Sequence, residues 1–331
     1  MTEKACSVKH LFIINPRSFW HKWKQEYVVS EIHKYFKTAE NNNYKIHISR
    51  FPRDAAGYIP LYAKHVSREN TLRVYAVGGD GILFDCLNGI IGLKNAELAA
   101  IPYGRSNNFI RGVGKNIKPL FRNISGICNA PAIPVDVIRC GDFFALNYCS
   151  VGFEADIVRR TREMRTRMEN RGAFSHWLSR RLYTFFYFTG GIITSLNTKL
   201  LPRNYKVSVD GEESGGYYRG FSFFNGPFYG GNFCPAKNAL PDDGILDILS
   251  IRGRGFLTYF LFPFYVTGRY KKFPKNFSSK QGRKIHISSN SPLQISMDDE
   301  IFYETELSID ILPAAVKFVD AGLKGFNGGR K

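Results

Sequence analysis

The chain has 331 residues, 44% hydrophobic and 15% aromatic, which is enough for two ordinary domains with packed cores and excludes a disordered chain. Its formal net charge of +18 indicates a surface that attracts anions: nucleic acid, nucleotide phosphates or acidic membrane headgroups. Six scattered cysteines with no C-x-x-C pair favour buried thiols over disulfides or a zinc site, so we expect a cytoplasmic protein. Glycine, proline or polar residues interrupt the apolar segments at 182–201 and around Pro263, so neither is expected to span a membrane.

Residues 1–134 alternate short apolar runs with helical patterns, which is typical of parallel α/β domains. Strands are expected at residues 10–15, 44–49, 72–77 and 96–102. Helices are expected at residues 22–38, at 54–67 with Asp54 as the capping residue, at 82–91, and at 109–114.

Residues 135–312 consist of many short alternating segments separated by turn residues, which predicts a β-sandwich or open barrel. The expected strands are 134–139, 143–153, 205–211, 219–226, 245–252, 283–289, 292–298 and 304–312. Helical or aromatic insertions are expected at about 157–201 and 254–275. The final segment, about 313–320, is expected to be a strand that returns to the first domain.

A glycine-rich turn, Gly78-Gly79-Asp80-Gly81, joins a buried strand to an apolar helix face. Such a turn presents unpaired backbone N–H groups and a positive helix end, which suits a phosphate. The carboxylate of Asp80 would repel a phosphate unless a divalent cation or a proton lay between them. The turn fits neither the Walker A nor the dinucleotide-binding spacing, and taken alone it is equally compatible with an ordinary strand-helix corner.

The surrounding residues make the pattern specific, because VGGDGILFDCLNGI resembles the G-G-D-G-T-x-x-E-x-x-N-G signature of the soluble diacylglycerol kinase and sphingosine kinase superfamily of lipid kinases. Asn15-Pro16, SRFPRDA and IPYGRSNNFIRGVG resemble three further elements of its first half. NYCSVGFEADIV, NGPFYGGNFCPAKNALPDDGILDI and MDDE resemble elements of its second half, and all of them occur in the family's order.

The resemblance implies an NAD-kinase-like α/β nucleotide-binding domain, a following β-sandwich lipid-binding domain, and catalysis in the cleft between them. Asp80 would hold a catalytic Mg²⁺, directly or through water, and Glu300 would be the general base for the lipid hydroxyl. The ATP site would comprise Asn15, Ser49, Gly78, Gly79, Asp80, Gly81, Ile82, Gly104, Arg105, Ser106 and Asn107. A second, structural Mg²⁺ would be held by the carbonyls of Leu240 and Ile245 and the side chain of Asp243. Without the resemblance, DDG is an ordinary hairpin turn and Glu300 a solvated residue.

The sequence departs from the family pattern at the candidate nucleotide site. Ile82 stands in place of the usual threonine and Arg105 in place of a second threonine, so the Arg105 guanidinium is expected to compensate for the lost hydroxyl. Asp85 replaces a glutamate, and Asn108 follows Asn107 where the family has aspartate. In the acidic turn, Asp299 replaces a glycine at a position expected to need a positive φ.

These observations favour an ATP-dependent, Mg²⁺-requiring lipid kinase that converts diacylglycerol to phosphatidic acid in phospholipid biosynthesis. The alternatives are a kinase for a sphingoid base or another amphiphilic alcohol, and a catalytically silent lipid- or nucleotide-binding relative. An NAD kinase shares the glycine turn but not the second-half motifs, and no nucleic-acid-binding module is recognisable. The basic stretch from Arg159 to Arg171, with Arg180, Arg181 and the apolar residues after them, suggests peripheral binding to the anionic inner face of the membrane. A homodimer is compatible with the sequence.

Overall fold

The computed structural model describes residues 7–19, 21–114, 116–169, 182, 185–186, 189–191, 193, 203–230, 233–252 and 257–322. The chain divides into two compact units, residues 1–136 with 313–331, and residues 137–312.

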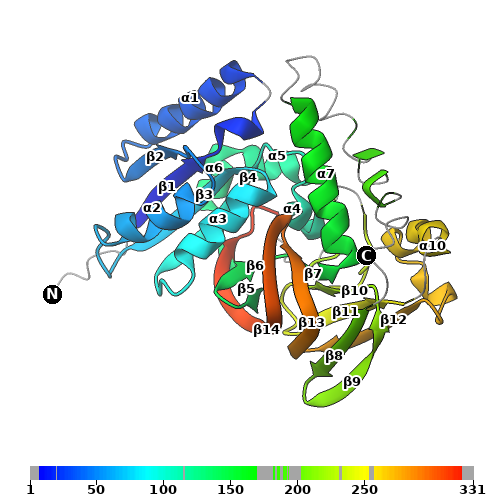
Figure 1. Ribbon diagram of the computed structural model, residues 1–331. Coiled ribbons are helices and arrows are strands. Elements are labelled where there is room, and N and C mark those ends of the chain that lie inside the picture. The colour runs from blue at the N-terminus through cyan, green and yellow to red at the C-terminus, as the bar shows by residue number, and fades with distance from the viewer. Residues whose placement is uncertain are drawn as a thin grey trace. The chain divides into compact units, whose positions relative to one another are not determined.

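The first unit is built on a parallel sheet in the order β2-β1-β3-β4, with the C-terminal end of β14 added beside β4 (Figure 1). The strands are β1 (Val8–Ile14), β2 (Tyr44–Ile48), β3 (Thr71–Gly78), β4 (Ala96–Pro102) and β14 (Glu300–Val319). The helices are η1 (Pro16–Ser18), α1 (Lys22–Thr38), α2 (Asp54–Ala63), α3 (Asp80–Ile90), α4 (Asn108–Val113), α5 (Lys118–Arg122) and α6 (Ile124–Asn129). Because β3 is buried along nearly its whole length, its carboxyl end delivers the glycine turn at a fixed edge of the sheet.

Asp54 does not cap α2, contrary to the sequence prediction. The capping residue is Arg53, in a left-handed conformation with φ 68°, and Asp54 is the first residue of the helix. The Asp54 carboxylate instead accepts hydrogen bonds from the His47 ring at 2.9 Å and the Arg50 amide at 2.9 Å. The Asp54 carboxylate therefore holds the loop before α2 by bonding to His47 and Arg50. A capping pattern in the sequence does not predict these contacts.

The second unit contains an antiparallel sheet in the order β12-β11-β10-β7-β13-β14. The strands are the end of β5 (Ala132–Cys140), β6 (Phe143–Ala145), β7 (Tyr148–Gly152), β8 (Arg203–Val209), β9 (Glu212–Tyr218), β10 (Gly220–Phe224), β11 (Leu246–Ile251), β12 (Phe277–Gly282), β13 (Lys284–Met297) and the start of β14. The helices are α7 (Phe153–Glu169), α10 (Leu257–Val266) and η3 (Tyr270–Lys272). One half of β13 pairs with β8 and the other with β7, across a register shift between Ser288 and Leu293.

Several predicted strand boundaries in this unit are wrong. The segments 283–289 and 292–298 form one strand, β13, because the chain passes the irregular stretch without turning. Segments 304–312 and 313–320 likewise form the single strand β14, whereas 143–153 breaks into β6, β7 and the start of α7. The strands β9 and β12 were not expected, because EESGGYY and FSSKQG lack alternating apolar residues.

The core of the second unit is aromatic and takes residues from the described parts of both expected insertions. The helix α7 contributes Phe153 and Ile157, and α10 contributes Phe262 and Tyr265, so the aromatic insertion is partly core. The basic and apolar residues 170–181, and most of those to 202, lie outside the described residues, and with them part of the predicted membrane surface. Among the residues that the structure describes, no helix is long and apolar enough to cross a membrane.

Glu154, at the start of α7, is a carboxyl group buried inside this core and 1% exposed. Its Oε2 atom accepts hydrogen bonds from the Ser222 and Tyr265 hydroxyls. Burial raises the pKa of Glu154 to about 7, although these hydrogen bonds lower it. The folded protein therefore holds a proton here over a range in which the unfolded chain, with a pKa of about 4.5, has released it.

We expect Glu154→Gln to change the pH dependence of stability. In the wild type this group's contribution falls as pH rises from about 4.5 to about 7, by about 3 kcal/mol in total. The amide cannot ionise, so the variant should resemble the wild type at pH 5 and be more stable at pH 8, as measured by urea denaturation. Equal pH dependence in the two proteins would contradict the assigned pKa.

Candidate active site

The glycine turn begins where β3 ends and leads directly into α3. Gly78 has φ 159°, and Gly79 is the N-cap of α3, so no side chain caps the helix. The first N–H groups of a helix have no partner within the helix, and the helix end carries a partial positive charge. This end of α3 can therefore accept an anion.

A second loop, at Gly104, packs against the glycine turn backbone to backbone. The carbonyl oxygen of Gly78 accepts hydrogen bonds from the amides of Tyr103 at 2.8 Å and Gly104 at 2.7 Å. A Cβ atom at Gly104 would lie 2.2 Å from the Gly79 Cα atom, so this close approach requires glycine at position 104. A Cβ atom at Gly79 would lie 3.1 Å from the Gly104 Cα atom, which is a tight contact. Asn107, with φ 49°, closes the loop by donating from Nδ2 to the Gly104 carbonyl at 2.7 Å.

Gly104→Ala should force the two loops apart. Because the added methyl group would meet backbone rather than a flexible side chain, we expect a loss of stability of about 1–3 kcal/mol. Nucleotide affinity should fall at least tenfold, measured by calorimetry on the folded variant. The matched control is Gly57→Ala in α2, where nothing lies within 4 Å of the added Cβ atom, and it should leave affinity unchanged. Wild-type affinity in Gly104→Ala would show that the loop contact is dispensable.

Asp80 joins the glycine turn to α4 and faces a group of cations. Its Oδ1 atom accepts a hydrogen bond from the Asn108 amide at 2.7 Å. Burial lowers the pKa of Arg111, and the Asp80 charge partly offsets this. Burial, Arg111 and Arg122 lower the pKa of Lys118, which Asp80 again raises. The half-buried Arg111 and Lys118 and the exposed Arg122 thus form a cationic group that an additional anion would stabilise.

Sequence reasoning assigned no role to this cationic group. Arg111 lies within the motif IPYGRSNNFIRGVG, so its position was available as a signal, although Lys118 and Arg122 belong to no motif. They come together because α4 and α5 follow the Gly104 loop directly, and because Arg122 donates to the Pro102 carbonyl at 2.8 Å.

The remaining predicted nucleotide residues belong to the same edge of the first unit. Asn15 follows β1, its amide donates to Val77 at 3.1 Å, and its side chain caps η1 by accepting from the Arg17 amide. Ser49 follows β2, and its amide donates to Ile14 at 2.8 Å. The ends of adjacent parallel strands thus bring Asn15, Ser49 and the glycine turn to one sheet edge, as in other α/β binding sites. Arg105 is half-buried in the Gly104 loop, and Ser106 is buried there.

The two substituted residues of the glycine motif, Ile82 and Asp85, have structural roles. Ile82 is 2% exposed, so its side chain belongs to the core. Asp85 accepts hydrogen bonds from the Arg53 amide at 3.1 Å and the Arg53 guanidinium at 3.3 Å, which anchors the loop before α2. Neither side chain replaces the donor that the family's threonine would provide.

In the second unit, the acidic turn between β13 and β14 is held by two of its three acidic residues. Asp298 accepts hydrogen bonds from the backbone amides of Leu146, Asn147 and Tyr148. Burial raises its pKa to about 7, although these amides lower it. Asp299 accepts from the Tyr148 hydroxyl at 2.6 Å. Its φ of 73° confirms the expected left-handed conformation.

Glu300, unlike Asp298, is partly exposed, and its carboxylate forms an ion pair with an arginine. Its Oε2 atom lies 3.1 Å from Nη1 of Arg162 on α7, and its side chain is 27% exposed. The hydrogen bonds of the buried Asp298 and the partly buried Asp299 therefore fix the backbone from which the Glu300 carboxylate projects.

The predicted structural metal turn lies just before β11. Gly244 has φ 71°, and the Asp243 carboxylate accepts from the Ile245 amide at 3.0 Å. Leu240 and Ile245 are half-buried and Asp243 is exposed, so a carboxylate and two carbonyls lie in a solvated turn. These oxygen donors fit Mg²⁺, which keeps several water ligands. In the described part of the chain, no group of three His, Cys, Asp or Glu residues could hold a metal by itself.

The comparisons with known proteins agree with both units. Residues 9–140 match the diacylglycerol kinase catalytic domain, and residues 148–320 match the YegS C-terminal NAD kinase beta sandwich-like domain. Relatives from Staphylococcus epidermidis and Staphylococcus aureus JH9, both provisionally named lipid kinases, are each 23% identical over 282 residues. The alignments cover 83% and 82% of this chain and 86% of each relative.

Two crystal structures from Bacillus anthracis show the same fold. The first, described as a diacylglycerol kinase, is 20% identical with a TM-score of 0.66, and the match covers 94% of this chain and 96% of that one. The second is 22% identical with a TM-score of 0.67, covering 94% and 97%. The predicted α/β domain followed by a β-sandwich-like domain is confirmed.

Proposed function

Because the chain belongs to the diacylglycerol kinase family of lipid kinases, we propose that it transfers the γ-phosphoryl group of ATP to the hydroxyl of diacylglycerol, giving phosphatidic acid. The observation that carries this proposal is the pair of interlocked glycine loops, with Asp80 and the cationic group around them. A polyphosphate fits this arrangement, because the arrangement offers backbone N–H groups, a helix end, and two cations, Arg111 and Lys118, whose charges act on Asp80.

In this proposal one group of residues positions the nucleotide phosphates, and another residue accepts the proton. The glycine loops and Arg111 with Lys118 would bind the phosphates, and Arg105 would add a bidentate guanidinium. Glu300 would accept the proton of the lipid hydroxyl as its oxygen bonds to the γ-phosphorus, and ADP would leave with the electron pair of the broken P–O bond.

Two groups of oxygen donors suit Mg²⁺ in this proposal. Asp80 would hold one ion beside the phosphates, and the Leu240, Asp243 and Ile245 turn would hold a structural ion. When bound beside the phosphates, Mg²⁺ would neutralise developing negative charge. The net charge of +18 supports peripheral binding to an anionic membrane, where the lipid acceptor resides.

A lipid panel with radiolabelled ATP tests the proposal. Mixed micelles containing diacylglycerol, a sphingoid base or monoacylglycerol are incubated with protein, ATP and Mg²⁺, and the labelled lipid is identified by chromatography. We expect label in phosphatidic acid at the highest kcat/KM. Label only in a sphingoid base would replace the proposed substrate, and binding of ATP without turnover of any lipid would indicate a silent relative.

A further inference from the structure

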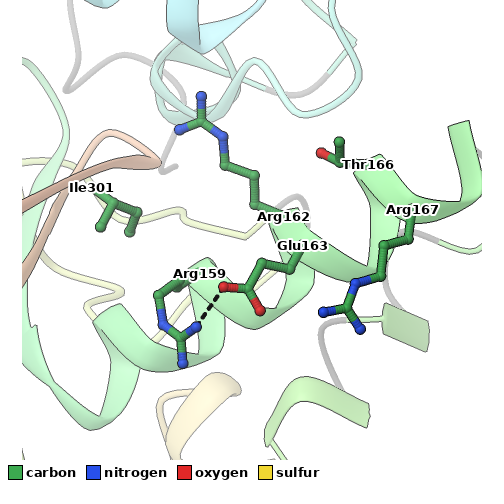
Figure 2. Close-up of a pocket in the computed structure, with 6 residues that line it drawn as sticks. All are labelled: Arg159, Arg162, Glu163, Thr166, Arg167 and Ile301. Carbon is green, nitrogen blue, oxygen red and sulfur yellow. Dashed lines mark hydrogen bonds and ion pairs between the residues drawn. The ribbon is translucent and has the colours of Figure 1, made fainter. Parts of the chain in front are cut away.

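The helix α7 carries a pocket of about 470 Å³ lined by Arg159, Arg162, Glu163, Thr166, Arg167 and Ile301 (Figure 2). The five helical residues recur at intervals of three and four, so they share one face of α7. Ile301, the residue after Glu300, closes the pocket from β14. The proposed reaction assigns no role to this cationic surface.

The three arginines of the pocket differ in how they are paired. Arg159 bonds to Asp156 at 2.6 Å and to Glu163 at 2.5 Å, and Figure 2 shows the second of these contacts inside the pocket. Arg162 contacts Glu300, as described above. Arg167 pairs with no carboxylate among the described residues. Three guanidinium groups thus face a pocket whose own lining supplies one carboxylate.

The arginine-rich lining of the pocket favours a ligand that contains a phosphate group. Guanidinium groups bind phosphate oxygens through paired N–H donors, and the Thr166 hydroxyl can add another donor. A phosphate monoester or diester carries the charge that this lining lacks, and Ile301 offers an apolar contact to the attached alcohol. If α7 were only a solvated surface helix, its arginines would have no reason to line a pocket next to the acidic turn.

Arg162 couples this pocket to the candidate base. Its guanidinium donates a hydrogen bond to Oε2 of Glu300, so in this arrangement one of the two carboxylate oxygens that could receive the hydroxyl proton is paired with a cation. A phosphate in the pocket would offer Arg162 a competing bidentate partner.

We propose that the α7 pocket binds a phosphate ester and that the bound phosphate draws Arg162 away from Glu300. The inference rests on the proposed role of Glu300, and it adds an activating ligand to that function. The phosphate ester can be the headgroup of an anionic phospholipid or a soluble phosphate ester, and the experiment distinguishes these sources.

The first measurement is binding, which does not depend on turnover. Calorimetry compares three ligands below micelle-forming concentrations: dihexanoyl phosphatidylmethanol, neutral dihexanoylglycerol and glycerol 3-phosphate. We expect the first to bind the wild type, and Arg162→Gln/Arg167→Gln to weaken it at least tenfold. Arg68→Gln, which removes an exposed charge outside the pocket, should bind like the wild type. Equal affinity for glycerol 3-phosphate would identify a soluble ester as the ligand, and unchanged affinity in the double variant would overturn the proposal.

The second measurement is the rate of diacylglycerol phosphorylation in uncharged detergent micelles with and without long-chain phosphatidylmethanol. The wild type should be stimulated severalfold. Arg162→Gln should have a higher basal rate and no stimulation, because Glu300 is already released. Arg167→Gln should keep the low basal rate and need more anionic lipid. A wild-type basal rate and stimulation in Arg162→Gln would overturn the proposal, whereas absence of kinase activity in every protein would count against the proposed function and leave the binding result to decide the pocket.

Discussion

Asp80→Asn should lower kcat for phosphoryl transfer by about 10³-fold, because the proposed role of its carboxylate in holding Mg²⁺ is worth several kcal/mol of charge stabilisation. The amide keeps the oxygen that accepts from the Asn108 amide, so the Gly104 loop and α4 should stay in place. The substitution should therefore affect the rate of phosphoryl transfer and leave Tm nearly unchanged.

The Asp80 variant should also separate metal binding from nucleotide binding. Removing the carboxylate leaves Arg111 and Lys118 without the negative charge that now acts on them. Metal-free ATP should then bind Asp80→Asn at least as tightly as it binds the wild type, while Mg²⁺ should no longer improve turnover. Calorimetry and rates across a Mg²⁺ titration check this. A kcat within threefold of the wild type, with the same Mg²⁺ requirement, would remove Asp80 from the proposed site.

Glu300→Gln should lower kcat by 10²- to 10⁴-fold, which is the usual contribution of a general base. The amide preserves the shape of the side chain and can still accept from Arg162, while Asp298 and Asp299 continue to hold the turn. ATP affinity should be unchanged, because no residue proposed to bind the nucleotide is altered.

The matched control for Glu300 is Glu304→Gln, which removes the same charge from an exposed position on the same strand. It should retain wild-type kcat and KM. Activity of Glu300→Gln within fivefold of Glu304→Gln would show that Glu300 does not take the hydroxyl proton.

The sequence predicts the first unit well because its elements have distinct periodicities. The buried strands β1, β3 and β4 are continuous apolar runs, and α1 shows a regular apolar face. The second unit is harder to predict, because β9 and β12 are polar or glycine-containing strands stabilised by pairing with their neighbours. The sequence also gives no local indication that β14 continues past Pro313 as a single strand.

In the candidate site too, local sequence patterns predict some features, whereas others depend on contacts between residues far apart in the sequence. The motif identifies Asp80, and the position of Asp299 predicts its positive φ. The contact of Arg162 with Glu300 joins residues 138 positions apart, and no local pattern relates α7 to β14. The lowered pKa values of Arg111 and Lys118 likewise cannot be recognised from the sequence, because they result from burial in the folded first unit.

The central claim is that the glycine loops present a nucleotide phosphate while Glu300 accepts the lipid proton in one reaction. A single-turnover transfer of label from saturating ATP to diacylglycerol, run on the wild type and Glu300→Gln, tests it most directly. The account predicts phosphatidic acid formation by the wild type and a rate at least 10²-fold lower in the variant with equal ATP occupancy. Equal rates in the two proteins, or no transfer to diacylglycerol by the wild type, would contradict it.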